Sequence, residues 1–186
     1  MKIIYEDIIL RDLLVEDIDN HVRWNMVDVE WMDWDAPWEK GDPFDADEYR
    51  SKKIEHITKY KDENLTRYGF QLEYKERHIG WVNAYNIDDN FDFTSNGQLA
   101  IGIDICESDC WGKGIGGKAY IAFIMYLFSC GYNELYTQTW SGNERMLCMA
   151  KRIGFRLCHS DVGIRQVRGK NYDRLTLKIT ADDCSE

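Results

Sequence analysis

A glycine-rich turn is the segment of this sequence best suited to bind a ligand. It runs from Trp111 to Gly117, reads Trp-Gly-Lys-Gly-Ile-Gly-Gly, and lies between a strand-like and a helix-like segment. Glycines permit tight turns and let a ligand approach the backbone amides. The first turn of a helix adds unpaired N–H groups and the positive end of the helix dipole. The turn therefore predicts a pyrophosphate-binding site, to which Lys113 adds a positive charge.

The spacing of these glycines excludes two common phosphate-binding loops. No Lys-Ser or Lys-Thr pair follows the last glycine, so the turn is not a Walker A loop. Gly112, Gly114 and Gly116 fit Gly-x-Gly-x-Gly, and no βαβ unit precedes them, so a dinucleotide fingerprint is not present either. On local grounds alone, a plain turn at the start of a helix remains an alternative.

The segments on both sides of the turn must position it. Before the turn, apolar residues alternate with small or polar ones: Leu99, Ile101, Ile103 and Ile105 with Ala100, Gly102 and Asp104. This period of two predicts a strand with one nearly bare face, and Gly102 within it marks a bulge or a close approach by another backbone. Residues 114–129 are apolar on nearly every side, which predicts a buried helix.

The remaining pattern predicts a mixed α/β domain. Strands are expected at 8–11, 68–74, 78–85, 135–140 and 155–159, and a hairpin at 164–167 and 173–179. Helices are expected at 16–26, at 46–62 after the capping box Asp45-x-x-Glu48, and from the capping box Ser141-x-x-Glu144 to Gly154. Residues 31–44, which interleave tryptophans with acids, are expected to be irregular.

Length and charge limit the classes of function. The 186 residues suit a single domain, expected to span 1–186. A net charge of -10 repels phosphate backbones, which argues against nucleic acid; it fits either a cationic partner or plain solubility. The longest apolar run, 119–128, is half of the ~20 residues that a membrane span needs, and the acidic start lacks a signal-peptide pattern. We therefore expect a cytoplasmic protein without a membrane partner.

The six cysteines favour a structural role over a chemical one. They are Cys106, Cys110, Cys130, Cys148, Cys158 and Cys184. No CxxC pair occurs, and no histidine lies at zinc-ligand spacing from a cysteine pair. We expect reduced thiols and no metal site.

At this point the sequence resembles a known family. Residues 101–105 followed by Trp111-Gly112-Lys113-Gly114-Ile115-Gly116 resemble motif A of the GNAT superfamily, in the Trp-Gly-Lys-Gly version of the branch that acetylates ribosomal-protein N termini. Residues 142–146 and 151–155 resemble motif B of that superfamily. The opening at 10–17 and the ending at 169–173 also look like that branch, and the resemblance is weakest between 28 and 65.

The resemblance implies a fold and a cosubstrate. The implied fold is a central, mostly antiparallel sheet of six to seven strands, splayed between the fourth and fifth strands and flanked by about four helices. The implied cosubstrate is acetyl-CoA, with its pyrophosphate on the glycine loop and its pantetheine arm along the preceding strand. The residues expected to contact it are Ile103, Asp104, Ile105, Trp111, Gly112, Lys113, Gly114, Ile115, Gly116, Gly117 and Asn143.

The implied reaction is direct acetyl transfer to an amine, which needs a proton acceptor, an oxyanion donor and an acid for the thiolate. Many relatives place a tyrosine seven residues after the motif B asparagine as the acid; here that position is Ala150, as is common in the ribosomal-protein branch. The candidates for proton transfer are Asp104 and Glu107 at the end of one strand and Ser141 at the end of the facing strand. Each also has an ordinary structural interpretation, as a strand-end, loop or helix-cap residue.

The acceptor side is less well defined. Aromatic faces and carboxylates hold ammonium groups, so the candidate acceptor residues are Trp34, Asp35, Trp38, Glu39 and Tyr172. The four residues between 34 and 39 fit equally well as core tryptophans and solvated acids. A protein N terminus, a polyamine and an aminoglycoside all remain possible acceptors, and a monomer and a homodimer are both compatible. The alternative to an enzyme is a non-catalytic acyl-CoA sensor or interaction module; a nucleotide-binding protein is the weaker alternative.

Overall fold

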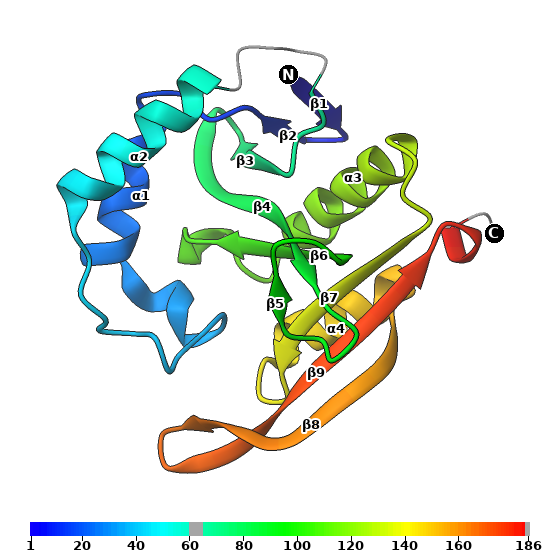
Figure 1. Cartoon of the computed structure of the whole chain (residues 1–186). Coiled ribbons are helices and arrows are strands. Elements are labelled where there is room, and N and C mark those ends of the chain that lie inside the picture. The colour runs from blue at the N-terminus through cyan, green and yellow to red at the C-terminus, as the bar shows by residue number, and fades with distance from the viewer. Residues whose placement is uncertain (60–64, 185–186) are drawn as a thin grey trace.

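The computed structural model describes residues 1–59 and 65–184. Within them, nine strands form one sheet in the order β1-β2-β3-β4-β6-β7-β9-β8, with β5 paired to β4. The strands are β1 (Lys2–Tyr5), β2 (Ile8–Arg11), β3 (Gly69–Tyr74), β4 (Arg77–Ile87), β5 (Phe93–Thr94), β6 (Gln98–Ile105), β7 (Glu134–Trp140), β8 (Arg156–Val167) and β9 (Lys170–Thr180). Figure 1 shows the β8–β9 hairpin extending as a long arm from one side of this sheet.

Helices lie on both sides of the sheet (Figure 1). They are the α-helices α1 (Asp17–Met26), α2 (Ala46–Lys59), α3 (Ile115–Ser129) and α4 (Glu144–Ile153), and the short 3-10 helices η1 (Val29–Asp33), η2 (Ser108–Cys110) and η3 (Asp182–Cys184). No helix in the described part of the chain is long and apolar enough to cross a membrane.

The sheet is antiparallel except where β6 meets β7. These two strands run parallel, and their register contains a single residue pair, Ala100 with Tyr136. By contrast, β6 pairs with β4 along its whole length, from Gln98 to Ile105. The two central strands therefore diverge beyond Ala100, as the resemblance implied.

The two faces of β6 pack against different parts of the protein. Ile101 belongs to the main core, which α3 covers, and Ile103 and Ile105 pack against it. On the opposite face, Asp104 lies beside Trp81 of β4. The Trp81 ring packs against His21 of α1, at 4.8 Å between ring centres, so α1 covers this second face.

The sequence predicted most of these elements, and the splay lies where it was expected, between the segments that became β6 and β7. The sheet has two more strands than the upper expectation, because β1 and β5 were not predicted. The capping box at Asp45 is confirmed in part, since its Oδ1 accepts the Glu48 N–H. The capping box at Ser141 is wrong, because Asn143 caps α4. The end of the helix expected at 46–62 falls outside the described residues.

Candidate active site

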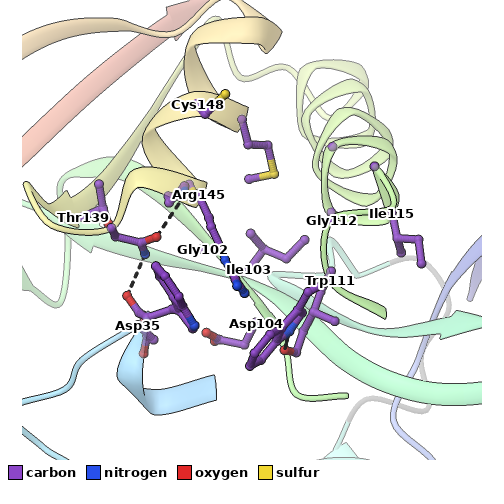
Figure 2. Close-up of a pocket in the computed structure, with 18 of the residues that line it drawn as sticks. Asp35, Gly102, Ile103, Asp104, Trp111, Gly112, Ile115, Thr139, Arg145 and Cys148 are labelled. Carbon is purple, nitrogen blue, oxygen red and sulfur yellow. Dashed lines mark hydrogen bonds between the residues drawn. The ribbon is translucent and has the colours of Figure 1, made fainter. Parts of the chain in front are cut away.

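A large cavity of about 1010 Å³ opens where β6 and β7 diverge. Its walls come from the segment after η1, from β6, from the glycine loop and the start of α3, and from β7 and α4 (Figure 2). The residues expected from the sequence that line it are Trp34, Asp35, Ile103, Asp104, Ile105, Trp111, Gly112, Gly114, Ile115, Gly116, Gly117 and Asn143. A volume of this size is at the upper end of the range for cofactor sites.

The glycine loop forms one wall of this cavity. Gly112 and Gly114 adopt left-handed φ angles of +71° and +77°, and Gly114 is the N-cap of α3. No acidic residue occupies the first turn of α3, so its free N–H groups keep their attraction for an anion. The Trp111 indole N–H donates to the Ile105 carbonyl at 2.7 Å, which fixes the loop to the end of β6.

Gly116 leaves little room beside it. A Cβ atom at this position would lie 3.3 Å from Met149 Sδ on α4 and 3.4 Å from Ile105 Cδ1 on β6. At Gly117, by contrast, a Cβ atom would meet nothing within 4 Å. Lys113, which was expected to add a charge to this site, is not among the residues that line the cavity.

The inner edge of β6 forms a second wall. The Ile101 carbonyl accepts the Tyr120 hydroxyl at 2.7 Å and the Thr137 hydroxyl at 3.0 Å, so its peptide oxygen points toward β7. Peptide groups in a strand alternate in direction, so those of Ile103, two residues further on, point the same way. At Ile103 the β6–β7 register has already ended. The cavity thus contains a strand edge that an extended ligand could pair with.

Asn143 anchors to α4 the segment that carries the expected acceptor residues Trp34 and Asp35, called the acceptor-side segment below. Its Oδ1 accepts the Met146 N–H at 3.0 Å, and its Nδ2 donates to the Trp34 carbonyl at 2.7 Å. The same carbonyl accepts the Trp140 indole N–H at 2.8 Å. Asn143 therefore lines the expected cosubstrate site while both ends of its side chain are engaged within the protein.

Arg145 is a cavity residue that sequence reasoning missed. Its guanidinium carbon lies 3.9 Å from the centre of the Trp34 ring and 4.7 Å from that of the Trp111 ring. Such stacking is favourable because the ring faces are electron-rich. The guanidinium joins the acceptor-side segment to the glycine loop. Its only sequence signal was its place in motif B, two residues after Asn143.

Two carboxylates reach into the cavity from different elements. Figure 2 shows Asp104 on β6 pointing toward the segment that carries Asp35. Burial raises the pKa of Asp104 well above its ordinary value, and the charge of Asp35 raises it further. Burial, with the charge of Glu39, raises the pKa of Asp35 to about 6. The Asp35 residue has a large solvent-accessible area, but that area faces the cavity. The protein around the cavity still makes the ionised form of its carboxyl group less favourable than in water.

Comparison with known proteins identifies the family of this chain. A family model described as an acetyltransferase (GNAT) domain matches residues 7–156. The chain belongs to the GNAT acetyltransferase family. None of the curated protein sequences matches it.

Solved structures with the same fold include several proteins named as acetyltransferases. The ribosomal L7/L12 alpha-N-protein acetyltransferase RimL, in complex with coenzyme A, is 14% identical, with a TM-score of 0.76 over 98% of this chain and 99% of that one. The ribosomal-protein-S5-alanine acetyltransferase from Vibrio fischeri is 18% identical, with a TM-score of 0.74 over 100% of both chains. The microcin C7 self-immunity acetyltransferase, in complex with acetyl-CoA and AMP, is 17% identical, with a TM-score of 0.68 over 94% and 93%.

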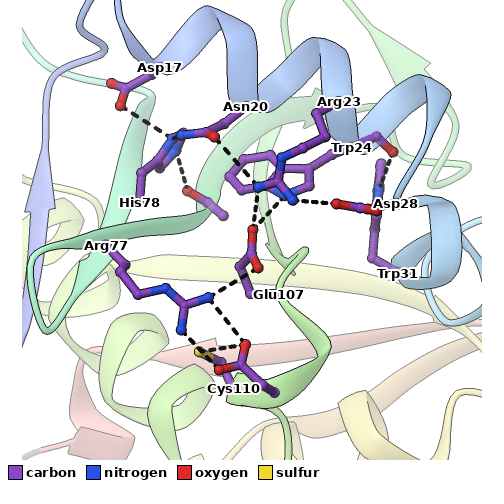
Figure 3. A network of polar contacts seen from close by, with 12 residues as sticks. Asp17, Asn20, Arg23, Trp24, Asp28, Trp31, Arg77, His78, Glu107 and Cys110 are labelled. Atoms are coloured by element: carbon purple, nitrogen blue, oxygen red, sulfur yellow. Dashed lines mark hydrogen bonds and ion pairs between the residues drawn. The ribbon is translucent and has the colours of Figure 1, made fainter.

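In this GNAT chain, Glu107 is not among the residues that line the cavity. It lies at the centre of an ion-pair network (Figure 3). Its carboxylate accepts from Arg23, from the Trp24 indole N–H at 2.9 Å and from Arg77 at 3.1 Å. Burial alone would raise its pKa, but the bonds from Arg23 and Trp24 outweigh burial and hold the pKa below its ordinary value. These contacts describe a structural carboxylate that joins α1 to the end of β6.

Ser141 and Tyr172 lie beside the GNAT cavity without lining it. The Ser141 hydroxyl accepts the Asp173 N–H at 3.0 Å, which ties the end of β7 to β9. The Tyr172 ring packs edge-on against Trp140, at 4.9 Å between ring centres. Both side chains thus support the elements next to the site.

Trp38 and Glu39 also lie outside the cavity lining. The Trp38 ring packs against Arg165 of β8, whose guanidinium carbon is 4.6 Å from the ring centre. Its indole N–H donates to Glu39 at 3.3 Å. Of the four acceptor candidates between 34 and 39, the structure brings Trp34 and Asp35 to the cavity and leaves the other two at its periphery.

Proposed function

We propose that this acetyltransferase moves the acetyl group of acetyl-CoA directly to a primary amine, without a covalent intermediate on the enzyme. The single observation that carries the proposal is the pair Asp35 and Asp104, which reaches into the cavity where β6 and β7 diverge. A carboxylate pair at this point suits a cationic acceptor that must lose a proton.

The cavity suits acetyl-CoA at its donor side. The free amides at the start of α3 and the left-handed Gly112 and Gly114 provide a cradle for a pyrophosphate. The unpaired edge of β6 at Ile103 offers peptide groups to the amides of a pantetheine arm. Arg152 lines the same cavity, has an exposed side chain, and can add a positive charge for the phosphates. The thioester would then lie near the point where the strands separate.

The acceptor amine needs a base. An alkylamine has a pKa of about 10.4, so it arrives mostly as an ammonium ion and cannot attack until deprotonated. Asp35 and Asp104 attract that ammonium ion, and Asp104, as the more buried of the two, is our candidate to take up the proton, directly or through a water molecule. Its raised pKa makes it a stronger base than an exposed aspartate.

The remaining steps use the backbone. As the amine nitrogen bonds to the thioester carbon, negative charge develops on the carbonyl oxygen, and the N–H of Ile103 is a suitable donor to it. The nitrogen, which carries a surplus proton after the attack, passes it to the carboxylate pair as the C–S bond breaks and the thiolate leaves. The proton held by the carboxylate pair is available to neutralise that thiolate, which would compensate for Ala150 at the position where many relatives carry a tyrosine acid.

The acceptor class is a protein N terminus or a small cationic amine. The named structural relatives include acetyltransferases of ribosomal-protein N termini, which supports the first. The carboxylates at the cavity support either. A cytoplasmic location would suit both acceptors, with residues 1–186 acting as one acetyltransferase domain, as a monomer or a homodimer.

The test is release of free CoA from acetyl-CoA in the presence of amine panels: peptides with N-terminal alanine or serine, polyamines and aminoglycosides. We expect turnover with at least one panel, reduced about 100-fold or more in Asp104→Asn with acetyl-CoA affinity retained. Tight binding of CoA without turnover on any amine would support a non-catalytic acyl-CoA sensor instead.

A further inference from the structure

A second cavity, of about 480 Å³, lies on the face of the sheet that α1 and α2 cover. Helix α2 provides Tyr49 and Lys53, α1 provides His21, and β4 provides Trp81 and Asn83. None of these residues lines the first cavity. The acetyl-transfer reaction proposed above leaves this cavity without a role.

His21, which lines this cavity, has an unsatisfied ring nitrogen. The residue is 2% exposed, and its Nε2 makes a 2.7 Å hydrogen bond with Gln71 Oε1. Since a carbonyl oxygen only accepts, Nε2 carries the proton. Burial lowers the pKa of His21 to about 4, so the ring is neutral at pH 7 and Nδ1 bears a lone pair. That Nδ1 is buried and has no hydrogen-bond partner. A buried acceptor without a donor is costly, which indicates that a donor belongs there.

Lys53 supplies an uncompensated charge to the same cavity. The Lys53 ammonium nitrogen lies 5.1 Å from the centre of the Tyr49 ring. The centres of the His21 and Tyr49 rings are 5.9 Å apart. Among the described residues, Lys53 forms no ion pair, whereas its neighbour Lys52 is paired with Glu48. Burial lowers the pKa of Lys53, as expected for a cation that lacks a counter-ion.

Among the described residues that line this cavity, Asp12 is the one carboxylate, and it is already neutralised. Asp12 accepts from Arg67 at 3.0 Å, and it also pairs with the N-terminal amine of Met1. It therefore does not serve Lys53. Within the described part of the chain, Lys53 thus lacks an anion and His21 Nδ1 lacks a hydrogen-bond donor, and both side chains lie close to the Tyr49 ring.

We propose that this second cavity binds a small organic carboxylate with a neighbouring O–H or N–H group. The carboxylate pairs with Lys53, the O–H or N–H donates to His21 Nδ1, and the carbon skeleton packs on Trp81. A volume of 480 Å³ holds a molecule of about amino-acid size.

The second cavity and the first are neighbours through the β4–β6 ladder. Trp81 and Asn83 pair across the ladder with Asp104 and Gly102, which line the first cavity. A Cβ atom on Gly102 would lie 2.9 Å from Asn83 Oδ1, so the two positions are in close contact.

The experiment is calorimetry on the full chain with 2-hydroxyisocaproate, isocaproate and 4-methylpentan-1-ol, which lack an amine and so bind independently of acetyl transfer. We expect 2-hydroxyisocaproate to bind with a Kd of about 1 mM or tighter. Isocaproate lacks the hydroxyl and the alcohol lacks the carboxylate, and each is expected to bind about tenfold more weakly or worse. Equal binding of 2-hydroxyisocaproate and isocaproate, or no binding of either, would overturn the proposal.

Variants locate the binding. Lys53→Met is expected to weaken 2-hydroxyisocaproate about tenfold or more, and His21→Phe to abolish its advantage over isocaproate. Lys52→Met, the adjacent and paired lysine, is the matched control and should bind normally. Thermal melting checks that each variant folds, and Lys53→Gln replaces Lys53→Met if the latter does not. Wild-type affinity in folded Lys53 and His21 variants would exclude this cavity as the site.

Discussion

The Arg145 guanidinium carbon lies 3.9 Å from the centre of the Trp34 ring, although 111 positions separate the two residues. With the bonds from Asn143 and Trp140 to the Trp34 carbonyl, this contact fixes the acceptor-side segment to the start of α4. The stack continues to Trp111 on the glycine loop. The Arg145 side chain therefore links the wall that carries Trp34 to the wall formed by the glycine loop.

Replacing Arg145 by leucine should loosen this arrangement. Two cation–ring contacts are lost, which predicts a fall in the free energy of unfolding of about 1–2 kcal/mol in urea denaturation. The Michaelis constant for the amine should rise, because Asp35 follows directly on Trp34. Arg152→Leu is the matched control: it removes the same charge from the same helix and cavity, but no ring stack. Equal stability losses in the two variants would contradict the role given to the stack.

Gly116→Glu should abolish acetyl-CoA binding. A carboxylate on the first turn of α3 would occupy the expected pyrophosphate position and repel its charge. Gly116→Ala is the control for space alone, since its Cβ would lie 3.3 Å from a methionine sulfur and so needs only a small shift. Calorimetry should show no binding for the glutamate variant and retained binding for the alanine variant. Unchanged affinity in Gly116→Glu would refute the assignment of the loop.

The pH dependence of kcat/KM should report the carboxylate pair. As pH falls, the pair takes up a proton, so kcat/KM should decline on the acidic side, and the raised pKa of Asp104 places this decline above the ordinary range of an aspartate. Asp35→Asn removes a negative charge that raises the pKa of Asp104, so the acidic limb should move to lower pH. A steady-state pH profile of both proteins measures this. A limb that stays in place in Asp35→Asn would show that the two groups are not coupled.

Asp104→Asn and Glu107→Gln should change stability in opposite directions. The folded pKa of Asp104 is raised, so its ionisation costs stability as pH rises above the unfolded value of 3.8; the asparagine variant should melt about 2–4 °C higher at pH 7. The folded pKa of Glu107 is lowered, so its charge stabilises above 4.5, and the glutamine variant should melt lower by a similar amount.

Melting curves at pH 4 and 7 separate these two effects. The difference in melting temperature between each variant and the wild type should be smaller at pH 4 than at pH 7. At pH 4 both carboxyl groups of the wild type are closer to full protonation in the unfolded chain. Activity gives the complementary contrast, since only Asp104→Asn should slow catalysis. If Glu107→Gln lost more kcat than Asp104→Asn when the same fraction of each protein is folded, Glu107 would be the proton acceptor instead of Asp104.

The donor side of the site could be predicted because it depends on local sequence. A strand, a glycine turn and a buried helix are adjacent in the chain, so Ile103 to Gly117 carry both the backbone geometry and its sequence signals. Gly102 was expected to mark a bulge or a close approach by another backbone, but its near neighbour is the Asn83 side chain, whose Oδ1 would lie 2.9 Å from a Cβ atom there. The same locality explains why Asp45 was recognised as a helix cap, since its Oδ1 accepts the N–H of Glu48, three residues further on.

The acceptor side depends on contacts between distant segments, which a local pattern does not contain. Asn143 was expected to face the cosubstrate, yet its amide is engaged with Trp34. Arg145 had no sequence signal beyond its place in motif B, which does not predict a stack between two tryptophans. Glu107 seemed well placed at a strand end, but the guanidinium groups that bind it come from α1 and β4, 84 and 30 residues away.

The divergence of β6 and β7 leaves peptide groups of a central strand without a protein partner in the described chain. A ligand that pairs with them adds its binding energy to folding, by an amount that grows with the logarithm of its concentration. The resistance of such a protein to unfolding and proteolysis is then set partly by metabolism. When its cosubstrate is scarce, less of the chain survives; when it is plentiful, more does, without any change in synthesis.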